Sequence, residues 1–381
     1  MPIFALNCGS SSIKSAIIDS ARRRRLFDVH VENADASGFS AAIAQVLQEL
    51  RSRSADHGQP DAIAHRIVHG GERFVHATQI DDRVLQEIEQ LSDLAPLHNP
   101  PALAAVRQAR DAYPRTPHIA IFDTAYHATL PRHAREYALP RELCERLGIR
   151  RYGFHGISHA HVMDSVAAHL GVTSDKLRII SCHLGNGASA AAIERGRSVD
   201  TSMGMTPLEG LVMGTRAGDL DPGILLHLLH SGAVDANGLD AVLNKKSGMA
   251  GLTGTNDMRE IERRAAAGDE QCRLALAVYA HRMRKYIGAY AAVMGGVDAI
   301  AFTGGVGENS AAIRRACLQR LEFLGAELDD GRNRHARLDA ATGCSEISRT
   351  GSRTRLLVVR ADEELAMALE AAALLSATSS S

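Results

Sequence analysis

Three segments that contain glycine follow short apolar runs, and each could bind an anion. They lie at residues 9–12, 185–189 and 304–309. Backbone N–H groups and hydroxyls that face one side of a turn, or the N-terminus of a helix, suit phosphate oxygens. One such turn is weak evidence, because an ordinary β-hairpin has the same composition. Three in one chain indicate a phosphate-containing ligand, bound without a Walker A motif, which the sequence lacks.

Two arginines stand near glycines that would let a ligand approach the backbone. Arg66 precedes Gly70 and Gly71, and Arg216 follows Gly214. The planar guanidinium group can bind a carboxylate or a phosphate through two hydrogen bonds. The alternative is that each arginine forms only a structural salt bridge.

An aspartate and a histidine are further candidates for chemistry. Asp123 follows an expected strand at residues 118–122, where a carboxylate could bind Mg²⁺ or orient a reacting oxygen, or simply cap the next segment. His155 and His159 have the spacing of metal ligands on a helix, but no further ligand is evident, so zinc is disfavoured. In its glycine-flanked loop, His155 is better interpreted as a hydrogen-bond donor to a polar substrate or transition state.

The apolar pattern predicts alternating strands and helices that would position these residues. Strands are expected over residues 62–68, 118–122, 177–184, 297–302 and 356–359, and helices over residues 39–51, 82–91, 102–112, 159–170, 222–230, 269–294, 310–320 and 362–375. The fold class is therefore α/β.

The first glycine hairpin has an echo later in the chain. The segment that starts at Asn7 (Asn-x-Gly-Ser-Ser) is matched by the segment that starts at His183 (His-x-Gly-Asn-Gly), and each lies between two apolar runs. Two domains that each open with a glycine hairpin aimed at one cleft would explain the echo. Chance similarity between two turns is the alternative.

The composition disfavours several classes of protein. A chain of 381 residues suffices for two or more domains, which commonly have about 100–200 residues each. A net charge of −1 and an aromatic content of 4% without Trp do not favour nucleic acid or an anionic membrane as partner. The four arginines at residues 22–25 are expected to form a solvated hairpin tip. The cysteines are scattered along the sequence, which favours reduced thiols in a cytosol. The sequence contains no long apolar run and no signal-peptide pattern, so neither a membrane span nor secretion is expected.

Together, these segments resemble the acetate kinase family of short-chain carboxylate kinases. The matching motifs follow the order of the family along nearly the whole chain. They are residues 7–14 (NCGSSSIK), 65–72 (HRIVHGGE), 96–100 (PLHNP), 122–127 (FDTAYH), 152–156 (YGFHG), 183–187 (HLGNG), 206–210 (TPLEG), 214–216 (GTR) and 302–309 (FTGGVGEN).

The resemblance implies a duplicated α/β fold of the actin, hexokinase and Hsp70 type (ribonuclease H-like), with the active site in an interdomain cleft. The implied N-terminal domain is residues 1–127 closed by residues 366–381, and the C-terminal nucleotide-binding domain is residues 128–365. The implied reaction is ATP + acetate ⇌ ADP + acetyl phosphate by direct in-line transfer, with Mg²⁺ or Mn²⁺. A cytoplasmic homodimer without nucleic-acid or membrane partners is expected. Propionate kinase of the same family is the first alternative, and a non-catalytic ATP-binding module like Hsp70 or actin is the second.

The resemblance also implies roles for single residues. Arg66 and Arg216 would hold the carboxylate and the phosphoryl group, Asp123 would orient the substrate or the metal, and His155 would donate to the transferring phosphoryl. Asn7 and Glu363 would lie near Mg²⁺. The acyl pocket would comprise Val68, Leu97, Phe154 and Pro207, beside Arg66. The nucleotide would contact Lys14, His183, Leu184, Gly185, Asn186, Gly187, Asp257, Met258, Arg259, Gly305, Val306, Gly307, Glu308 and Asn309.

Two departures from the family pattern bear on specificity. Cys8 stands where acetate kinases commonly have Ala, and in this it resembles the residue found in propionate kinases. Met258 stands where the family frequently has a Phe near the adenine. One methylene group contributes only about 1–3 kcal/mol of discrimination, so the sequence leaves acetate and propionate open.

Overall fold

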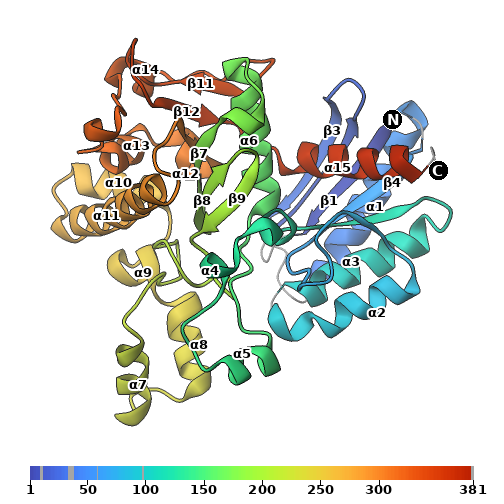
Figure 1. Cartoon of the computed structure of the whole chain (residues 1–381). Helices are drawn as coiled ribbons and strands as arrows, with labels where there is room; N and C mark the ends of the chain where they lie inside the picture. The colour runs from blue at the N-terminus through green and yellow to red at the C-terminus, as the bar shows by residue number, and fades with distance from the viewer. Residues whose placement is uncertain (9–11, 33–37, 58, 97, 379–381) are drawn as a thin grey trace. The chain divides into compact units, whose positions relative to one another are not determined.

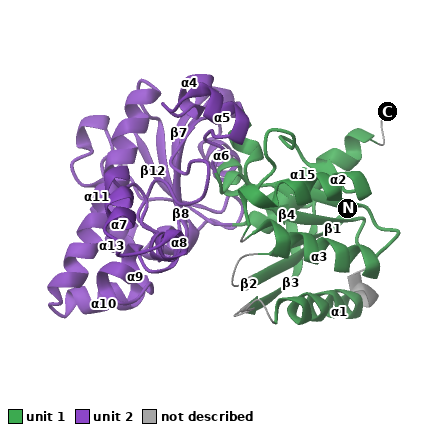
Figure 2. Ribbon diagram, turned by 90° about the horizontal axis from the view of Figure 1, so that it is seen from below, with its two compact units in different colours: residues 1–128, 154–161, 362–381 green, residues 129–153, 162–361 purple. Residues whose placement is uncertain are grey.

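The computed structural model describes residues 1–8, 12–32, 38–57, 59–96 and 98–378 (Figure 1). The chain forms two compact units (Figure 2). Unit 1 comprises residues 1–128, 154–161 and 362–381, and unit 2 comprises residues 129–153 and 162–361. This division differs from the expected one, because residues 154–161 and the start of the last helix pack with the N-terminal sheet.

Unit 1 is built on a six-stranded mixed sheet with the order β3-β2-β1-β4-β6-β5. Its strands are β1 (Pro2–Cys8), β2 (Ser12–Asp19), β3 (Arg24–Glu32), β4 (Ala62–Ile67), β5 (Thr78–Gln79) and β6 (His118–Phe122). Strands β1, β4 and β6 are parallel, whereas β1–β2, β2–β3 and β5–β6 are antiparallel pairs. The carboxyl ends of the three parallel strands therefore meet at one edge of the sheet.

Helices cover both faces of this sheet. They are α1 (Phe39–His57), α2 (Asp82–Gln90), α3 (Asn99–Ala112) and α15 (Glu363–Thr378), with short 3₁₀ turns η1 (Ser92–Leu94) and η2 (Ala125–Thr129). Phe4 and Leu6 of β1 belong to the core that includes α1 and α3, whereas Ile3 and Ala5 belong to the core that includes α15. This alternation explains why β1 is apolar along its whole length.

Unit 2 repeats the topology of unit 1. Its sheet has the order β11-β12-β10-β7-β8-β9, which is the order of unit 1 read in reverse with six added to each strand number. The strands are β7 (Arg178–Leu184), β8 (Ala188–Glu194), β9 (Arg197–Thr201), β10 (Ala299–Thr303), β11 (Cys344–Glu346) and β12 (Arg355–Val359). Strands β7, β10 and β12 are parallel, like β1, β4 and β6. The echo between the two glycine hairpins therefore reflects a duplicated sheet, as expected.

The helices of unit 2 are α4 (Arg132–Arg135), α5 (Arg141–Leu147), α7 (Pro222–His230), α8 (Ala236–Lys245), α9 (Gly248–Thr253), α10 (Met258–Ala266), α11 (Glu270–Val293), α12 (Gly304–Asn309), α13 (Ala311–Leu318) and α14 (Asp330–Arg334), with η3 (Ser174–Lys176) and η4 (Glu322–Leu324). Helix α6 (Gly156–Leu170) begins in unit 1 and continues in unit 2. Helix α11 buries Ala275, Tyr279, Met283 and Ile287, which recur at helical spacing.

Helix boundaries differ from the expected ones at two informative places. Helix α1 continues to His57 rather than ending near residue 51. Residues 304–309, expected to be a loop, form the short helix α12, after which the Ser310 side chain accepts a hydrogen bond from the Ile313 N–H and starts α13. The glycines of this segment concealed its helical conformation, because glycine is the weakest helix former after proline. No helix in the described part of the chain is long and apolar enough to cross a lipid bilayer.

A pair of buried histidines lies inside unit 1. His65 of β4 and His118 of β6 are 2% and 5% exposed, and their ring nitrogens Nε2 and Nδ1 lie 2.9 Å apart. The second ring nitrogen of His118 lies 3.2 Å from the Tyr113 carbonyl oxygen. Burial lowers the pKa of both imidazoles below their usual range, so the folded chain holds them neutral.

We predict that this pair makes the folded state sensitive to acid. Below the unfolded pKa of about 6.5 the unfolded chain gains protons that the folded chain does not, which lowers the free energy of unfolding by up to about 1.4 kcal/mol for each histidine at pH 5.5. The melting temperature should therefore fall between pH 7.5 and 5.5, and fall less in a His65→Gln/His118→Gln variant. Exposed His76→Gln is the control, and an equal pH dependence of all three proteins would refute the prediction.

Candidate active site

Three polar side chains converge where the parallel strands of unit 1 end. Asn7 lies near the end of β1, Arg66 near the end of β4, and Asp123 directly after β6. The Asp123 N–H donates to the Ile67 carbonyl oxygen, which extends the β4–β6 pairing by one step. In α/β sheets this edge is where ligands bind.

Arg66 and Asp123 form a buried, bidentate ion pair. Arg66 Nε donates to Asp123 Oδ1 at 3.0 Å, and Arg66 Nη2 donates to Asp123 Oδ2 at 2.6 Å. The side chains are 14% and 2% exposed. Burial by itself would lower the pKa of Arg66, but the charges of Asp123 and Glu363 raise it above its ordinary value, so the guanidinium stays charged. The structural salt bridge considered for Arg66 is thus present, at the ligand-binding edge of the sheet.

Asn7 connects this pair to the start of helix α15. Its Oδ1 accepts from Arg66 Nη1 at 3.0 Å, and its Nδ2 donates to Glu363 at 2.9 Å and to Glu364 at 3.0 Å. Glu363 also lies 3.6 Å from Arg66 Nη1. Both glutamates occupy the first turn of α15, where the helix dipole favours negative charge. Glu364 was missed in the sequence, because only its neighbour Glu363 was assigned a role.

The donors around Arg66 fit a magnesium ion that is bound together with phosphates. Among the described residues, no cluster of three His, Cys, Asp or Glu side chains could hold a metal ion alone. Mg²⁺ in phosphoryl-transfer sites usually keeps several waters and takes only one or two carboxylates from the protein. The Glu363 carboxylate suits that role. The Asn7 amide instead bridges Arg66 and the glutamates, and its Oδ1 would have to leave Arg66 to reach a metal.

The loop that carries Phe154 and His155 is packed tightly on the end of β6. The Gly156 N–H donates to the Asp123 carbonyl oxygen at 2.9 Å, and a Cβ at position 156 would lie 2.2 Å from the same oxygen. His155 adopts a left-handed backbone conformation with φ 57°, and its N–H donates to the Asp123 carboxylate. His155 carries a Cβ, so this left-handed backbone conformation is strained, and strained residues are common at functional sites.

The predicted acyl-pocket residues divide between the two units. Val68 and Phe154 belong to unit 1 and are 6% and 1% exposed. The Phe154 ring makes an edge contact with His69, with centroids 5.6 Å apart. Pro207 belongs to unit 2, and Leu97 lies outside the described residues.

In unit 2, the glycine turn between β7 and β8 supports the loop that carries Arg216. The turn closes through the Gly185 N–H and the Gly187 carbonyl oxygen at 3.0 Å. The Gly214 N–H donates to the Asn186 carbonyl oxygen at 2.8 Å, and a Cβ at position 214 would lie 2.0 Å from Asn186 Oδ1. Only glycine permits this approach, which brings Arg216 near the predicted phosphate turn.

Arg216 differs from Arg66 in its partners among the described residues. Its Nη1 donates to the Pro207 carbonyl oxygen at 2.8 Å and contacts Met213 Sδ at 3.6 Å. Among the described residues, no carboxylate pairs with it. Burial lowers the pKa of Arg216. A desolvated guanidinium without a carboxylate is an anion-binding group, so the structural salt bridge considered for Arg216 is absent from the described structure.

The predicted nucleotide residues are partly brought together in unit 2. Gly304 has φ 81°, and a Cβ there would lie 2.7 Å from the Leu184 carbonyl oxygen, so α12 begins directly on the end of β7. Within α12, Asn309 donates to the Gly305 carbonyl oxygen at 2.8 Å, and Glu308 accepts from the Ala361 N–H at 2.9 Å. Hydrogen bonds between the Asn309 and Glu308 side chains and backbone groups therefore hold the segment 305–309, which follows the strand end paired with His183.

The remaining nucleotide candidates are exposed or half-buried. Asp257 caps α10 and pairs with Arg259 at 3.0 Å, and Met258 opens that helix. Asn256, which the sequence did not single out, donates to Asn186 Oδ1 at 3.0 Å and so joins this segment to the glycine turn. No sequence motif indicated that Asn256 would be a site residue. Lys14 is exposed on β2, opposite Asn7.

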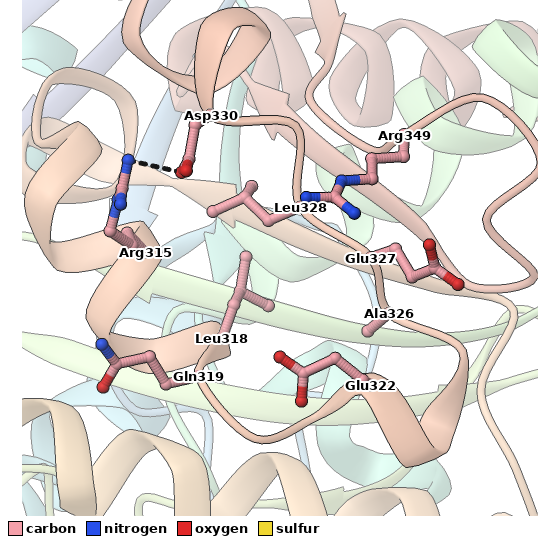
Figure 3. A pocket seen from close by; sticks show the side chains of 9 residues that line it. All are labelled: Arg315, Leu318, Gln319, Glu322, Ala326, Glu327, Leu328, Asp330 and Arg349. Carbon is pink, nitrogen blue, oxygen red and sulfur yellow. Dashed lines mark ion pairs between the residues drawn. The ribbon is translucent and has the colours of Figure 1, made fainter.

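A cavity of about 300 Å³ in unit 2 contains none of the predicted site residues (Figure 3). Its lining comprises Arg315, Leu318, Gln319, Glu322, Ala326, Glu327, Leu328, Asp330 and Arg349. Arg315 is paired with Asp330 at 2.5 Å across its rim. Charges of both signs line this cavity, so it lacks the excess of cationic donors that phosphate binding requires.

Comparison with known proteins agrees with this geometry. The sequence profile of the acetokinase family matches residues 27–369. The acetate kinase of Streptomyces coelicolor is 46% identical over 398 residues, which cover 98% of this chain and 97% of that protein. The crystal structure of Porphyromonas gingivalis acetate kinase has a TM-score of 0.88 at 39% identity and covers 98% of this chain and 99% of that one. A propionate kinase from Francisella tularensis has a TM-score of 0.87 at 36% identity, over 97% and 98% of the two chains.

A more distant likeness concerns the fold alone. A ROK hexokinase from Thermus thermophilus is 14% identical, with a TM-score of 0.50 over 99% of this chain and 100% of that one. The expected duplicated fold of the actin and hexokinase type is thereby confirmed. The chain belongs to the acetokinase family, whose members are kinases that use ATP and ADP as co-substrates.

Proposed function

We propose that the chain catalyses ATP + acetate ⇌ ADP + acetyl phosphate with Mg²⁺ by direct in-line transfer. The observation that carries this proposal is the pair of partly buried arginines, of which Arg66 is neutralised by a carboxylate and Arg216 is paired with none among the described residues. Transfer of a phosphoryl group needs positioning and stabilisation of negative charge more than a covalent intermediate. The names of the closely similar acetate kinases support acetate as the acceptor.

In this proposal each side chain has a separate task. Arg216 binds the negative charge that the phosphoryl oxygens carry, because it has no carboxylate of its own. Asp123 fixes the orientation of Arg66, which would donate to the acetate carboxylate through the N–H of Nη1 that Asn7 does not occupy. His155 donates to the transferring group from the loop packed on Asp123. Glu363 would hold Mg²⁺ together with the nucleotide phosphates, and the ion would supply charge neutralisation.

Replacing the two arginines should give different results. Arg216→Gln should lower kcat by a factor of about 10² or more with little change in melting temperature, because no carboxylate loses its partner. Arg66→Gln should lower kcat and also destabilise the fold by about 3–5 kcal/mol, because Asp123 stays buried without its counter-ion. Steady-state kinetics and thermal melts measure both effects, with exposed Arg132→Gln as the control. A change in KM alone for Arg216→Gln would contradict its role.

Propionate kinase activity is the second candidate, favoured by two observations. Cys8 resembles propionate kinases at its position, and the Francisella tularensis propionate kinase is similar over nearly the whole chain. The Val68 and Phe154 side chains would line the acyl pocket, where an extra methylene must fit without displacing either.

We expect kcat/KM to decrease from acetate to propionate to butyrate. Each added methylene should cost a factor of about 10–200, which is the usual discrimination of an apolar pocket. Steady-state kinetics with ATP and Mg²⁺ across the three acids measures the series. A higher kcat/KM for propionate than for acetate would instead assign the chain as a propionate kinase, and no turnover of any acid would exclude both.

We propose further that the chain forms a homodimer through helix α7 and acts in the cytoplasm. Helix α7 carries no buried residue although most of its residues are apolar. Ile224, Leu226 and Leu229 are 44%, 56% and 38% exposed, and Leu220 just before the helix is 42% exposed. Several exposed apolar side chains on one short helix commonly mark a protein interface. Six free cysteines fit a reducing compartment.

The dimer proposal predicts a change in molar mass on mutation. An Ile224→Lys/Leu226→Lys variant should elute as a monomer, because charges placed at the centre of an interface are not solvated there. Light scattering coupled to size-exclusion chromatography measures the mass. Leu147→Lys, which changes a residue that is 52% exposed on α5, should leave the dimer intact. A dimeric double variant, or a monomeric wild type, would disprove this assignment.

A further inference from the structure

The arginine run at residues 22–25 is not uniformly solvated. Arg22 is 75% exposed and pairs only with Asp19 of the same hairpin, at 3.7 Å. Arg25, the last of the four, is 34% exposed. Its Nη2 lies 2.6 Å from Asp362 and 3.3 Å from Glu364, which belong to the other end of the chain. The expectation of a solvated tip is therefore wrong for Arg25.

The contacts of Arg25 lead to Arg66 within unit 1. Glu364, 9% exposed, accepts from Arg25 on one oxygen and from Asn7 Nδ2 on the other. The Asn7 amide in turn donates to Glu363 and accepts from Arg66 Nη1 at 3.0 Å. Asp362 accepts from the Leu365 N–H at 3.1 Å, so Arg25 also contacts the residue that caps the start of α15.

Charge balance shows what Arg25 contributes. Asp362, Glu363 and Glu364 are three consecutive carboxylates at the start of α15. Arg25 pairs with Asp362 and Glu364, and Arg66 lies 3.6 Å from Glu363. Without Arg25, Glu364 would remain buried with the Asn7 amide as its partner and beside a second carboxylate. Its charge would then draw Asn7 and Arg66 toward α15.

We propose that Arg25 is a positioning residue for the phosphoryl transfer, because it holds Glu364 and thereby fixes the Asn7 amide against Arg66. The proposal rests on the proposed function, since Arg66 is taken to bind the acetate carboxylate. Arg25 itself touches no substrate. By holding Glu364, Arg25 keeps the Arg66 guanidinium in place for acetate and limits the negative potential that an anionic substrate meets.

Two consequences distinguish this role from a merely structural one. Loss of Arg25 makes the surroundings of Arg66 more negative and pulls its guanidinium toward α15, and both changes weaken acetate binding. The KM for acetate should therefore rise more than the KM for ATP, because the side chain of Arg25 pairs with Asp362 and Glu364 and with none of the predicted nucleotide residues, whether Lys14 in unit 1 or the others in unit 2. A substitution that merely leaves a fraction of the enzyme molecules unfolded lowers the apparent kcat and changes neither the KM for acetate nor the KM for ATP.

The test compares R25Q, E364Q, R25K, R25Q/E364Q and the matched control R24Q in the full-length enzyme. Arg24 is exposed in the same run and has no ion pair in the described structure. R25Q should raise the KM for acetate and lower kcat. The combined effect should lower kcat/KM for acetate by a factor of about ten or more, which corresponds to the loss of one charge-assisted hydrogen bond. R25K should keep most of the activity. R25Q/E364Q should recover the KM for acetate, because the uncompensated carboxylate is gone.

The outcomes separate this proposal from the proposed function. If the wild type phosphorylates acetate but R25Q matches R24Q in all constants, only the role of Arg25 is refuted. Additive effects of R25Q and E364Q would also refute it, because coupling through Glu364 requires them to be non-additive. A wild type that does not phosphorylate acetate would refute both proposals. If R25Q does not fold, R25K and R25Q/E364Q still decide, because each keeps the charge balance.

Discussion

The buried ion pair between Arg66 and Asp123 is the interaction on which the rest of unit 1 depends. Two charges can leave water at the end of a sheet only if their geometry is good and their remaining donors are satisfied. Parallel pairing of β4 and β6 supplies the geometry. On the side of Arg66 that does not face Asp123, Nη1 donates to Asn7 and lies near the Glu363 carboxylate. The pair therefore ties three strands and the start of α15 to one arrangement. That arrangement is also what a carboxylate substrate would need.

The two units of the duplicated fold differ in the electrostatic state of their arginines, Arg66 in unit 1 and Arg216 in unit 2. In unit 1 the arginine is neutralised, so its direction is fixed. In unit 2, the contacts of the Arg216 side chain with the described residues are to a carbonyl oxygen and a sulfur atom, which leaves its positive charge for an anion. Glycine makes both arrangements feasible, because Gly156 lies against Asp123 and Gly214 against Asn186 at distances that exclude a Cβ.

The sequence predicted the local elements well and the long-range contacts poorly. Strands β6 and β10 and helix α11 follow from apolar runs and spacing, and Arg66 and Asp123 could be proposed because they stand at strand ends. The sheet order could be expected only from the family resemblance, because pairing between distant strands leaves no local signal. Arg25 and Asp362 lie 337 positions apart, so nothing near Arg25 indicated its partner. Helix α12 was missed because its glycines suggest a loop.

A crystal structure of the enzyme with MgADP, aluminium fluoride and acetate would test the central claim most directly. The account predicts a planar fluoride group in line between the ADP β-phosphate and an acetate oxygen. Arg66 Nη1 should lie within hydrogen-bond distance of the acetate, and Arg216 within that distance of the fluoride. A complex in which neither arginine contacts these groups, or in which a protein side chain stands in line with ADP instead of acetate, would contradict it.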